Sequence, residues 1–255
     1  MEQLPLFPLS QYREFVAVDC ETTGLDPKVD RLVEIAVHRF INGQPIQLFQ
    51  RIVDPGVPIP PSASAVHFLT DYDVEGTARP QEALEDLATF VSDSVVVAHN
   101  APFDRSFLPT IGHLRWACSM RLARHIWPTA PSFKNQVLRF LLNLSHPALT
   151  GRPAHRAAAD AMVTGLIFER GVRAFVALRP DGTILDLLDY IRAPLSIAGF
   201  DYGYEYRGWP IHEIPSQYLE WVVQEAAGPA QGRHINVDPD TLKAVQEILE
   251  LNRAA

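Results

Sequence analysis

The sequence predicts an α/β protein in which a mixed β-sheet flanked by helices is followed by a small C-terminal module. Three strand-like stretches come first, and helices alternating with short strands follow them, an order typical of α/β domains with a mixed sheet. From residue 199 the composition changes to one rich in aromatic residues. We therefore expect a main domain at residues 1–178, a connector at residues 179–198 and a module at residues 199–255.

Hydrophobic periodicity and turn residues locate the individual elements. Three β-branched, apolar stretches predict strands at residues 14–20, 32–40 and 45–53, and Asn42-Gly43 predicts a hairpin turn between the last two. Apolar residues at helical spacing behind Pro80 predict a helix at residues 81–91, and an apolar stretch predicts a buried strand at 94–100. A short strand is expected at 115–119, and further helices at 102–110, 119–126, 132–143, 155–175 and 240–251.

The composition is that of an ordinary globular protein, with 47% hydrophobic and 20% charged residues. Cys20 and Cys118 lie in apolar stretches, which predicts reduced, packed thiols and favours a reducing compartment. The N-terminal stretch carries Pro5 and Pro8 and no basic segment, so we expect no signal peptide. No apolar run in the sequence approaches the ~18 residues of a membrane span. We expect a cytoplasmic protein without a membrane partner.

The distribution of charge points to an anionic partner, although the net charge is −8. No Asp or Glu occurs between Asp104 and Asp160. The same stretch holds eight basic residues: Arg105, Arg115, Arg121, Arg124, Lys134, Arg139, Arg152 and Arg156. Such asymmetry indicates an anionic molecule docking beside residues 105–156. A solvated helical face accounts for the same residues, and the sequence leaves both interpretations open.

Two acidic residues close the first predicted strand, in the stretch VAVDCET. Residues two apart on a strand share a face, so Asp19 and Glu21 are neighbours while Cys20 points to the other face. Two carboxylates side by side repel unless one is protonated or a cation lies between them, and oxygen ligands suit Mg²⁺. The pair therefore predicts a divalent metal site, with an ordinary solvated strand end as the alternative.

Two further acids and a histidine lie at element ends. Asp104 follows the apolar strand at 94–100, and strand ends are the usual place of ligand sites in α/β folds. Asp160 lies on the first turns of an alanine-rich helix, and His155 falls at or just before its start. Taken singly, each has a local explanation: a cap for Asp104, a helix-dipole partner for Asp160 and a surface imidazole for His155.

Four motifs carry a resemblance to a known family: VDCETTGL, VHFLTDYDV, AHNAPFD and HRAAAD. In this order they resemble the DEDDh 3′→5′ exonucleases over roughly residues 14–175, and the resemblance implies a ribonuclease H-like core. The segment WACSMRLARHIWP is similar to the exodeoxyribonuclease X branch of that family. YGYEYRG and IPSQYLEWVV resemble the C-terminal module of that branch, but Tyr204-Glu205 stand where its glycine-aromatic motif usually has a lysine.

The resemblance implies a catalytic site with two divalent metal ions, Mg²⁺ or Mn²⁺. The ions would be held by four carboxylates: Asp19, Glu21, Asp104 and Asp160. In this arrangement Asp19 bridges both ions, Glu21 and Asp160 complete one site, and Asp104 helps to hold the second. His155 would deprotonate the attacking water, a role that suits an imidazole because its pKa lies near working pH.

The resemblance also implies contacts with the substrate. Thr22, Thr23 and Gly24 would lie at the terminal 3′-hydroxyl, and Leu25 would form a wedge against the last base. Three other residues would touch sugar, phosphate or base: His67, Asn100 and Phe103. Core packing is the alternative role for Leu25 and Phe103.

We therefore expect a nuclease that hydrolyses phosphodiester bonds at DNA 3′ ends and releases 5′-mononucleotides, in DNA repair or end-trimming. Its partner is nucleic acid, with DNA preferred over RNA. Two alternatives stay open: an RNA-trimming exonuclease of the ribonuclease T type, and a catalytically idle binding module. In the C-terminal module acids outnumber bases. A packing or protein-docking role built on its aromatic residues therefore stands beside nucleic-acid binding (Tyr206, Trp209, Tyr218 and Trp221).

Overall fold

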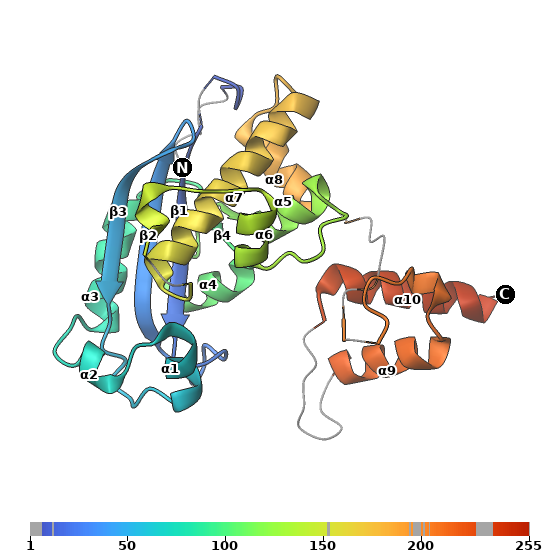
Figure 1. The fold of residues 1–255 in the computed structure, drawn as a ribbon, viewed down its shortest axis with the longest axis horizontal. Coiled ribbons are helices and arrows are strands. Elements are labelled where there is room, and N and C mark those ends of the chain that lie inside the picture. Colours follow the sequence, from blue (N-terminus) through green and yellow to red (C-terminus); the bar gives the residue numbers. More distant parts are fainter. Residues whose placement is uncertain are drawn as a thin grey trace. The chain divides into compact units, whose positions relative to one another are not determined.

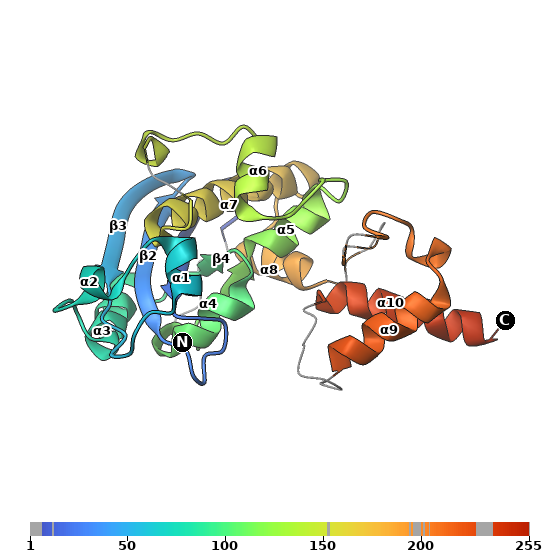
Figure 2. The ribbon, with the colours of Figure 1, turned by 60° about the horizontal axis from the view of Figure 1, so that its bottom comes forward.

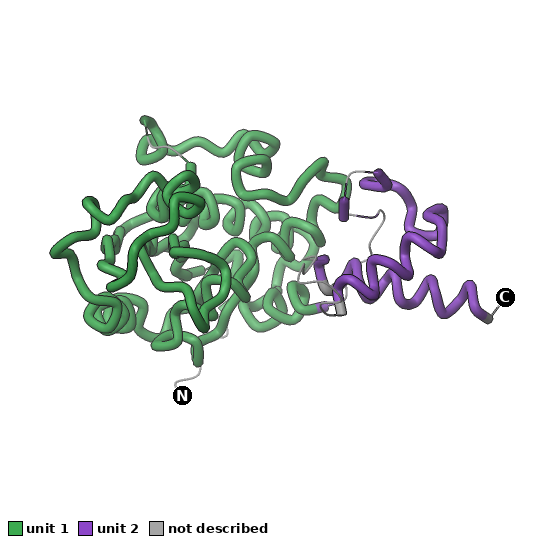
Figure 3. Tube along the Cα trace, turned by 90° about the horizontal axis from the view of Figure 1, so that it is seen from below, with its two compact units in different colours: residues 1–192 green, residues 193–255 purple. Residues whose placement is uncertain are grey.

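The protein divides into two compact units, Met1–Arg192 and Ala193–Ala255, which Figure 3 distinguishes by colour. The computed structural model describes residues 7–11, 13–151, 154–193, 195, 200, 202–203, 205–227 and 237–254. Among the residues discussed above, Pro5, Arg152 and Tyr204 lie outside these ranges, as does part of the expected connector. Within the described ranges, no helix combines the length and the apolar character that crossing a membrane requires.

A mixed sheet of five described strands forms the centre of the first unit (Figure 1). Its order is β3-β2-β1-β4-β5. The first three strands are antiparallel neighbours, whereas β4 and β5 run parallel to β1. Asn42 and Gly43 have φ angles of 48° and 82° and form the predicted hairpin turn. The strands are β1 (Glu14–Thr22), β2 (Leu32–Ile41), β3 (Gln44–Ile52), β4 (Val96–Ala98) and β5 (Trp116–Cys118).

Helices pack against both faces of this sheet (Figures 1 and 2), which confirms the predicted α/β class. Alternation along β1 sorts its side chains: Phe15 and Ala17 enter one core with α7, and Val16 and Val18 enter the other with α3. The helices of this unit are α1 (Pro61–His67), α2 (Asp71–Val74), α3 (Pro80–Val91), α4 (Ala101–Phe107), α5 (Ser119–Ile126), α6 (Asn135–Leu141), α7 (Ala157–Leu178) and α8 (Ile184–Arg192).

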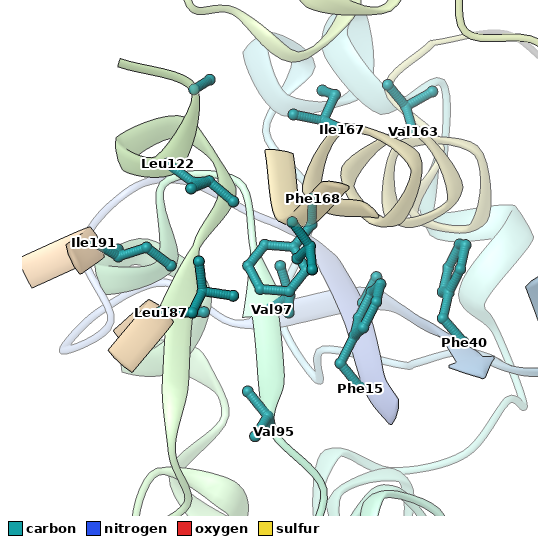
Figure 4. Packing of buried hydrophobic residues seen from close by; sticks show 14 of the residues in the cluster. Phe15, Phe40, Val95, Val97, Leu122, Val163, Ile167, Phe168, Leu187 and Ile191 are labelled. Carbon is teal, nitrogen blue, oxygen red and sulfur yellow. The ribbon is translucent and has the colours of Figure 1, made fainter. Parts of the chain in front are cut away.

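The core beneath α7 is built around aromatic rings (Figure 4). The ring of Phe15 stacks on Phe40 with centroids 5.0 Å apart and meets the edge of Phe168 at 4.8 Å. Leu187 and Ile191 of α8 are buried in the same core. The structure therefore places residues 184–192 in the first unit and not in a connector, because this amphipathic helix buries its apolar face there.

The second unit has a small core of its own. It contains η3 (Ile211–Glu213), α9 (Ser216–Ala227) and α10 (Pro239–Ala254). Apolar side chains from these elements pack around Phe200, which is fully buried. The ring of Tyr218 lies 4.7 Å from Tyr206 and 5.5 Å from Trp221, so part of the aromatic composition serves packing within the unit.

Candidate active site

The end of β1 places Asp19 and Glu21 on the face that α7 covers. Phe15 and Ala17 of the same strand enter the core beneath α7, and residues at two-residue spacing continue on that side. Cys20 points to the opposite face and packs with Val18. The neighbouring positions of the two carboxylates therefore follow from the strand period, as the sequence predicts.

Asp160 joins these two carboxylates from the first turn of α7. Alanines around it let the helix approach β2 closely: Ala157, Ala158 and Ala161 are buried against Ala36. As a result, carboxylate oxygens of Asp19, Glu21 and Asp160 lie within 4.8 Å of one another. Acids from two parts of the sequence far from each other thus converge at one edge of the sheet.

Burial and mutual repulsion change the proton affinity of this cluster. Burial, followed by the charges of Asp104 and Glu21, raises the pKa of Asp19 well above its ordinary value. Burial and the nearby Asp160 raise the pKa of Glu21 to about 8. Burial also raises the pKa of Asp160, although its hydrogen bonds oppose the shift. In the absence of a cation, burial and mutual repulsion therefore favour the protonated form of these carboxylates.

Asp104 lies at the cluster but does not share its closest set of oxygens. Its Oδ1 accepts hydrogen bonds from the backbone N–H of Cys20 at 3.2 Å and from the Cys20 thiol at 3.4 Å. Burial raises the pKa of Asp104 to about 7, and its charge is the foremost of those that raise the pKa of Asp19. The α4 helix therefore brings this acid into electrostatic contact with the cluster from the Cys20 side.

His155 lies directly before α7, with its backbone in the left-handed region at φ 59°. Its backbone N–H donates to Oδ2 of Asp160 at 2.8 Å, so the turn fixes this carboxylate. The imidazole itself is exposed, and its charge lowers the pKa of Asp160. The histidine ring and the cluster thus share one solvent-facing edge.

Glu34 anchors the start of α7 to the sheet, a role that the sequence analysis missed. Its carboxylate is fully buried and pairs with Arg156 at 2.9 Å, while it also accepts from the backbone N–H of Ala157 at 3.1 Å. Burial favours a higher pKa for Glu34, but hydrogen bonds from Arg156 and Gln50 outweigh it and lower that pKa. An acid inside an otherwise apolar strand was the available signal, because buried acids need partners.

Gln136 of α6 is a second residue that sequence reasoning missed. Its Nε2 donates to Oδ1 of Asp160 at 2.5 Å, so both oxygens of this carboxylate are held by hydrogen bonds. Asn135 donates to the hydroxyl of Thr164 at 2.8 Å and ties α6 to α7. No periodic feature of the sequence singled out Gln136, since its contact depends on the packing of two helices.

The loop after β1 holds the residues expected at the 3′-hydroxyl. The hydroxyl of Thr22 donates to the carbonyl of Gly24 at 2.5 Å, and the hydroxyl of Thr23 donates to Asp30 at 3.1 Å. A Cβ on Gly24 would lie 2.4 Å from Oδ2 of Asp30, which explains the need for glycine. The backbone N–H of Thr23 also donates to the carbonyl of Arg31 at 2.9 Å, so the loop is held by its own hydrogen bonds.

The other expected substrate residues occupy three different environments. Leu25 is 82% exposed, and Asn100 is exposed at the N-cap of α4 with φ 68°. His67 is buried, and burial lowers its pKa. Phe103 is partly buried and packs on Phe107 with ring centroids 5.1 Å apart. The structure therefore excludes core packing for Leu25 and shows packing for part of the Phe103 ring.

Several members of the basic stretch bind protein groups. Arg105 donates to the carbonyl of Gly112, Arg121 donates to the carbonyl of Ile191, and Arg156 pairs with Glu34. Arg124 lies over the ring of Phe133 at 5.3 Å. Part of the positive charge between Asp104 and Asp160 therefore stabilises the fold, which a count of charges in the sequence does not reveal.

The acid cluster fits a divalent metal ion by its chemistry. All its donors are carboxylate oxygens, the ligands that Mg²⁺ and other hard cations prefer. Burial and repulsion by neighbouring carboxylates raise the pKa of Glu21, and a bound cation would lower it again. Asp19, Glu21 and Asp160 are the residues that could hold an ion, and Asp104 is the further carboxylate whose charge acts on Asp19.

A five-stranded mixed sheet with acids gathered at the end of β1 defines a ribonuclease H-like exonuclease fold. Residues 16–168 match the model of the RNase T exonuclease family, so this chain belongs to that family of nucleases. The resemblance to DEDDh 3′→5′ exonucleases is thereby confirmed.

Individual relatives extend this comparison. Exodeoxyribonuclease 10 of Escherichia coli (strain K12) is 30% identical over 210 residues, which cover 80% of this chain and 88% of the relative. The PolC-type DNA polymerase III of Halalkalibacterium halodurans is 33% identical over 168 residues, 63% of this chain. The match spans only 11% of that polymerase's own length.

Solved structures show the same fold. A structure of exonuclease X in complex with 5′-overhanging duplex DNA superposes with a TM-score of 0.59 and 30% identity, covering 69% of this chain and 99% of that chain. Escherichia coli exonuclease I in complex with a dA16 oligonucleotide superposes with a TM-score of 0.56 over 95% of this chain and 71% of that chain. At 14% identity the second match concerns the fold alone.

Proposed function

We propose that this protein is a metal-dependent 3′→5′ exodeoxyribonuclease, which hydrolyses the terminal phosphodiester bond of DNA and releases 5′-mononucleotides in DNA repair or end-trimming. The observation that carries the proposal is the convergence of Asp19, Glu21 and Asp160 within 4.8 Å, beside Asp104. DNA is preferred over RNA as the substrate because two relatives at 30% identity are an exodeoxyribonuclease and an exonuclease crystallised with duplex DNA. Cys20 and Cys118 are both free thiols, which suits the proposed cytoplasmic location.

The acids bind the cofactor in this proposal. Asp19, Glu21 and Asp160 would hold two divalent ions, Mg²⁺ or Mn²⁺, with the help of Asp104. When bound, such ions supply Lewis acidity for the phosphoryl group and neutralise the charge of the transition state. Gln136 and the backbone N–H of His155 orient Asp160 for this role.

The remaining residues handle the proton and the end of the strand. His155 accepts the proton of the attacking water on a ring nitrogen, and its exposed position leaves room for that water. Backbone or hydroxyl groups of Thr22, Thr23 and Gly24 bind the 3′-hydroxyl, and the exposed Leu25 lies against the last base. The further contacts to sugar, phosphate and base are assigned to three residues: His67, Asn100 and Phe103.

A degradation assay on labelled strands tests the proposal. The protein is incubated with 5′-labelled and 3′-labelled single-stranded DNA and with RNA of the same sequence, in Mg²⁺ and in EDTA. We expect mononucleotide from the 3′-labelled DNA at once, a descending ladder from the 5′-labelled DNA, and no product in EDTA. Faster loss of RNA would reverse the choice of substrate.

Variants measured in the same assay test the catalytic roles of individual residues. Asp19→Asn should abolish turnover, and His155→Ala should reduce it by about 10²–10⁴-fold, the usual contribution of a general base. Asp93→Asn is the matched control, because Asp93 is an exposed aspartate between α3 and β4. Undiminished turnover in either site variant contradicts the proposed mechanism. Binding of DNA without any turnover by the unmodified protein would identify an idle binding module instead.

A further inference from the structure

Phe68 has a backbone conformation and an exposure that its residue type disfavours. It ends α1 as the C-cap residue in the left-handed region, with φ 60° and ψ 21°. Glycine meets this conformation without steric conflict, whereas a side chain with a Cβ does not. Phe68 is nevertheless 65% exposed, so packing of its side chain compensates for little of the backbone strain. A strained, exposed aromatic residue needs an explanation outside the folding of α1.

The neighbour of Phe68 lies against the loop of the candidate active site. His67 is 1% exposed, and its Nδ1 accepts from the backbone N–H of Leu69 at 3.1 Å, which places the ring proton on Nε2. The Thr22 backbone raises the pKa of His67 against the effect of burial, so the imidazole lies beside the end of β1. Figure 1 shows α1 at this end of the strand.

His67 joins α1 to the loop of the candidate active site. Its Nε2 is buried and lies against the Thr22 backbone, although no acceptor among the described residues reaches full hydrogen-bond geometry with it. Phe68 directly follows His67, so its exposed side chain lies next to the part of α1 that contacts the loop proposed to bind the 3′ end.

We propose that the ring of Phe68 stacks on a nucleobase near the 3′ end of the substrate strand. This inference rests on the proposed function and extends it to a residue outside the acid cluster. Stacking on an aromatic face tolerates every base, because each base has a π-face. Phe68 therefore contributes to the affinity for single-stranded ends and not to sequence preference. Leu25, which is also exposed on the loop after β1, is apolar but offers no ring for stacking.

Steady-state kinetics and thermal unfolding of three variants test the inference. Phe68→Gly removes the ring and relieves the backbone, Phe68→Leu keeps an apolar side chain, and Phe68→Trp keeps an aromatic face. With 3′-labelled single-stranded DNA and Mg²⁺, we expect KM to rise by about 5- to 100-fold in the glycine and leucine variants. The tryptophan variant should stay close to wild type. Because the ring binds ground and transition states alike, kcat should fall by less than KM rises.

The unfolding temperature distinguishes a role of Phe68 in substrate binding from a role in the fold. Phe68→Gly should unfold at the wild-type temperature or higher, since glycine suits the left-handed backbone. Leu178→Ala is the matched control, an equally exposed apolar residue at the far end of α7 from Asp160, and it should leave KM unchanged. A lower unfolding temperature of Phe68→Gly with an unchanged KM would overturn the inference. Wild-type protein that degrades no nucleic acid would instead overturn the proposed function.

Discussion

Glu34 and Arg156, 122 residues apart in the chain, form a two-point ion pair at the start of α7. Nε of Arg156 lies 3.1 Å from Oε2 of Glu34, and its terminal nitrogen lies 2.9 Å from Oε1. Glu34 is also the cross-strand partner of Glu21 on β1. Within the pair, the charge of Glu34 raises the pKa of Glu21 and the charge of Arg156 lowers it by less, while the pair fixes the turn that carries His155. Because Glu34 is buried, loss of Arg156 would leave an uncompensated charge inside the protein and lower its stability.

Removal of Arg156 should destabilise the protein and disturb the site. Arg156→Met leaves the Glu34 carboxylate buried without its cation, which we expect to lower the free energy of unfolding by about 3 kcal/mol. Urea denaturation measures this change. Arg51→Met is the control, because the Arg51–Asp86 pair has a similar distance of 3.0 Å but is exposed and should contribute at most about 1 kcal/mol. Equal losses of unfolding free energy in the two variants would show that burial of Glu34 does not increase the contribution of its ion pair to stability.

The stability of the metal-free protein should fall as pH rises. The folded-state pKa of Glu21 is about 8, whereas its ordinary value is 4.5, so unfolding releases a proton between these values. Stability is therefore greatest below about pH 4.5 for this group and is lost as pH approaches about 8. Asp104, with a pKa of about 7, acts in the same direction.

Thermal unfolding in EDTA across this pH range measures the effect. Mg²⁺ should stabilise the protein more at pH 8 than at pH 5, because binding requires deprotonated carboxylates. Glu21→Gln should flatten the pH dependence in EDTA. The slope that remains in this variant belongs to the other carboxylates of the site, Asp19, Asp104 and Asp160. A slope as steep as that of the wild type would show that Glu21 does not contribute.

Gln136 should affect the affinity for metal through Asp160. Gln136→Met keeps the side-chain volume but removes the donor to Oδ1, so we expect the dissociation constant for Mn²⁺ to rise about tenfold. Titration of the unfolding temperature with Mn²⁺ gives this constant without any substrate. Gln81→Met serves as the control, because the amide of Gln81 donates at 2.7 Å to the exposed Glu85 on α3. An identical affinity in the two variants would contradict the assigned role.

Gly165 should resist replacement by alanine although it lies within α7. Helix propensity alone predicts that Gly165→Ala stabilises the protein by about 1 kcal/mol. A Cβ at this position would lie 2.2 Å from a ring carbon of Phe40, which is itself buried in the core. We therefore expect a loss of about 1–3 kcal/mol in urea denaturation. A gain in stability would show that the Phe40 ring can move away.

Local patterns accounted for most of the elements. The β-branched, apolar stretches, the Asn42-Gly43 turn and the helical spacing behind Pro80 each correspond to an element of the structure, since these signals depend on near neighbours in the chain. The sequence predicts a connector at residues 184–192, where the structure has a helix. Its burial in the first core depends on contacts with β-strands and helices far away in sequence.

The sequence by itself determined that Asp19 and Glu21 share a face of β1, because strand geometry fixes that relation over two residues. It also determined the family, because four short motifs occur in one order along the chain. The family resemblance implied that Asp104 and Asp160 act with these acids, but only the tertiary structure decided that Asp160 lies within 4.8 Å of them and that Asp104 hydrogen-bonds to Cys20. It likewise decided that Glu34 and Gln136 hold the start of α7. Such contacts join segments that a helix or strand period cannot relate, so they arise from packing of the whole domain.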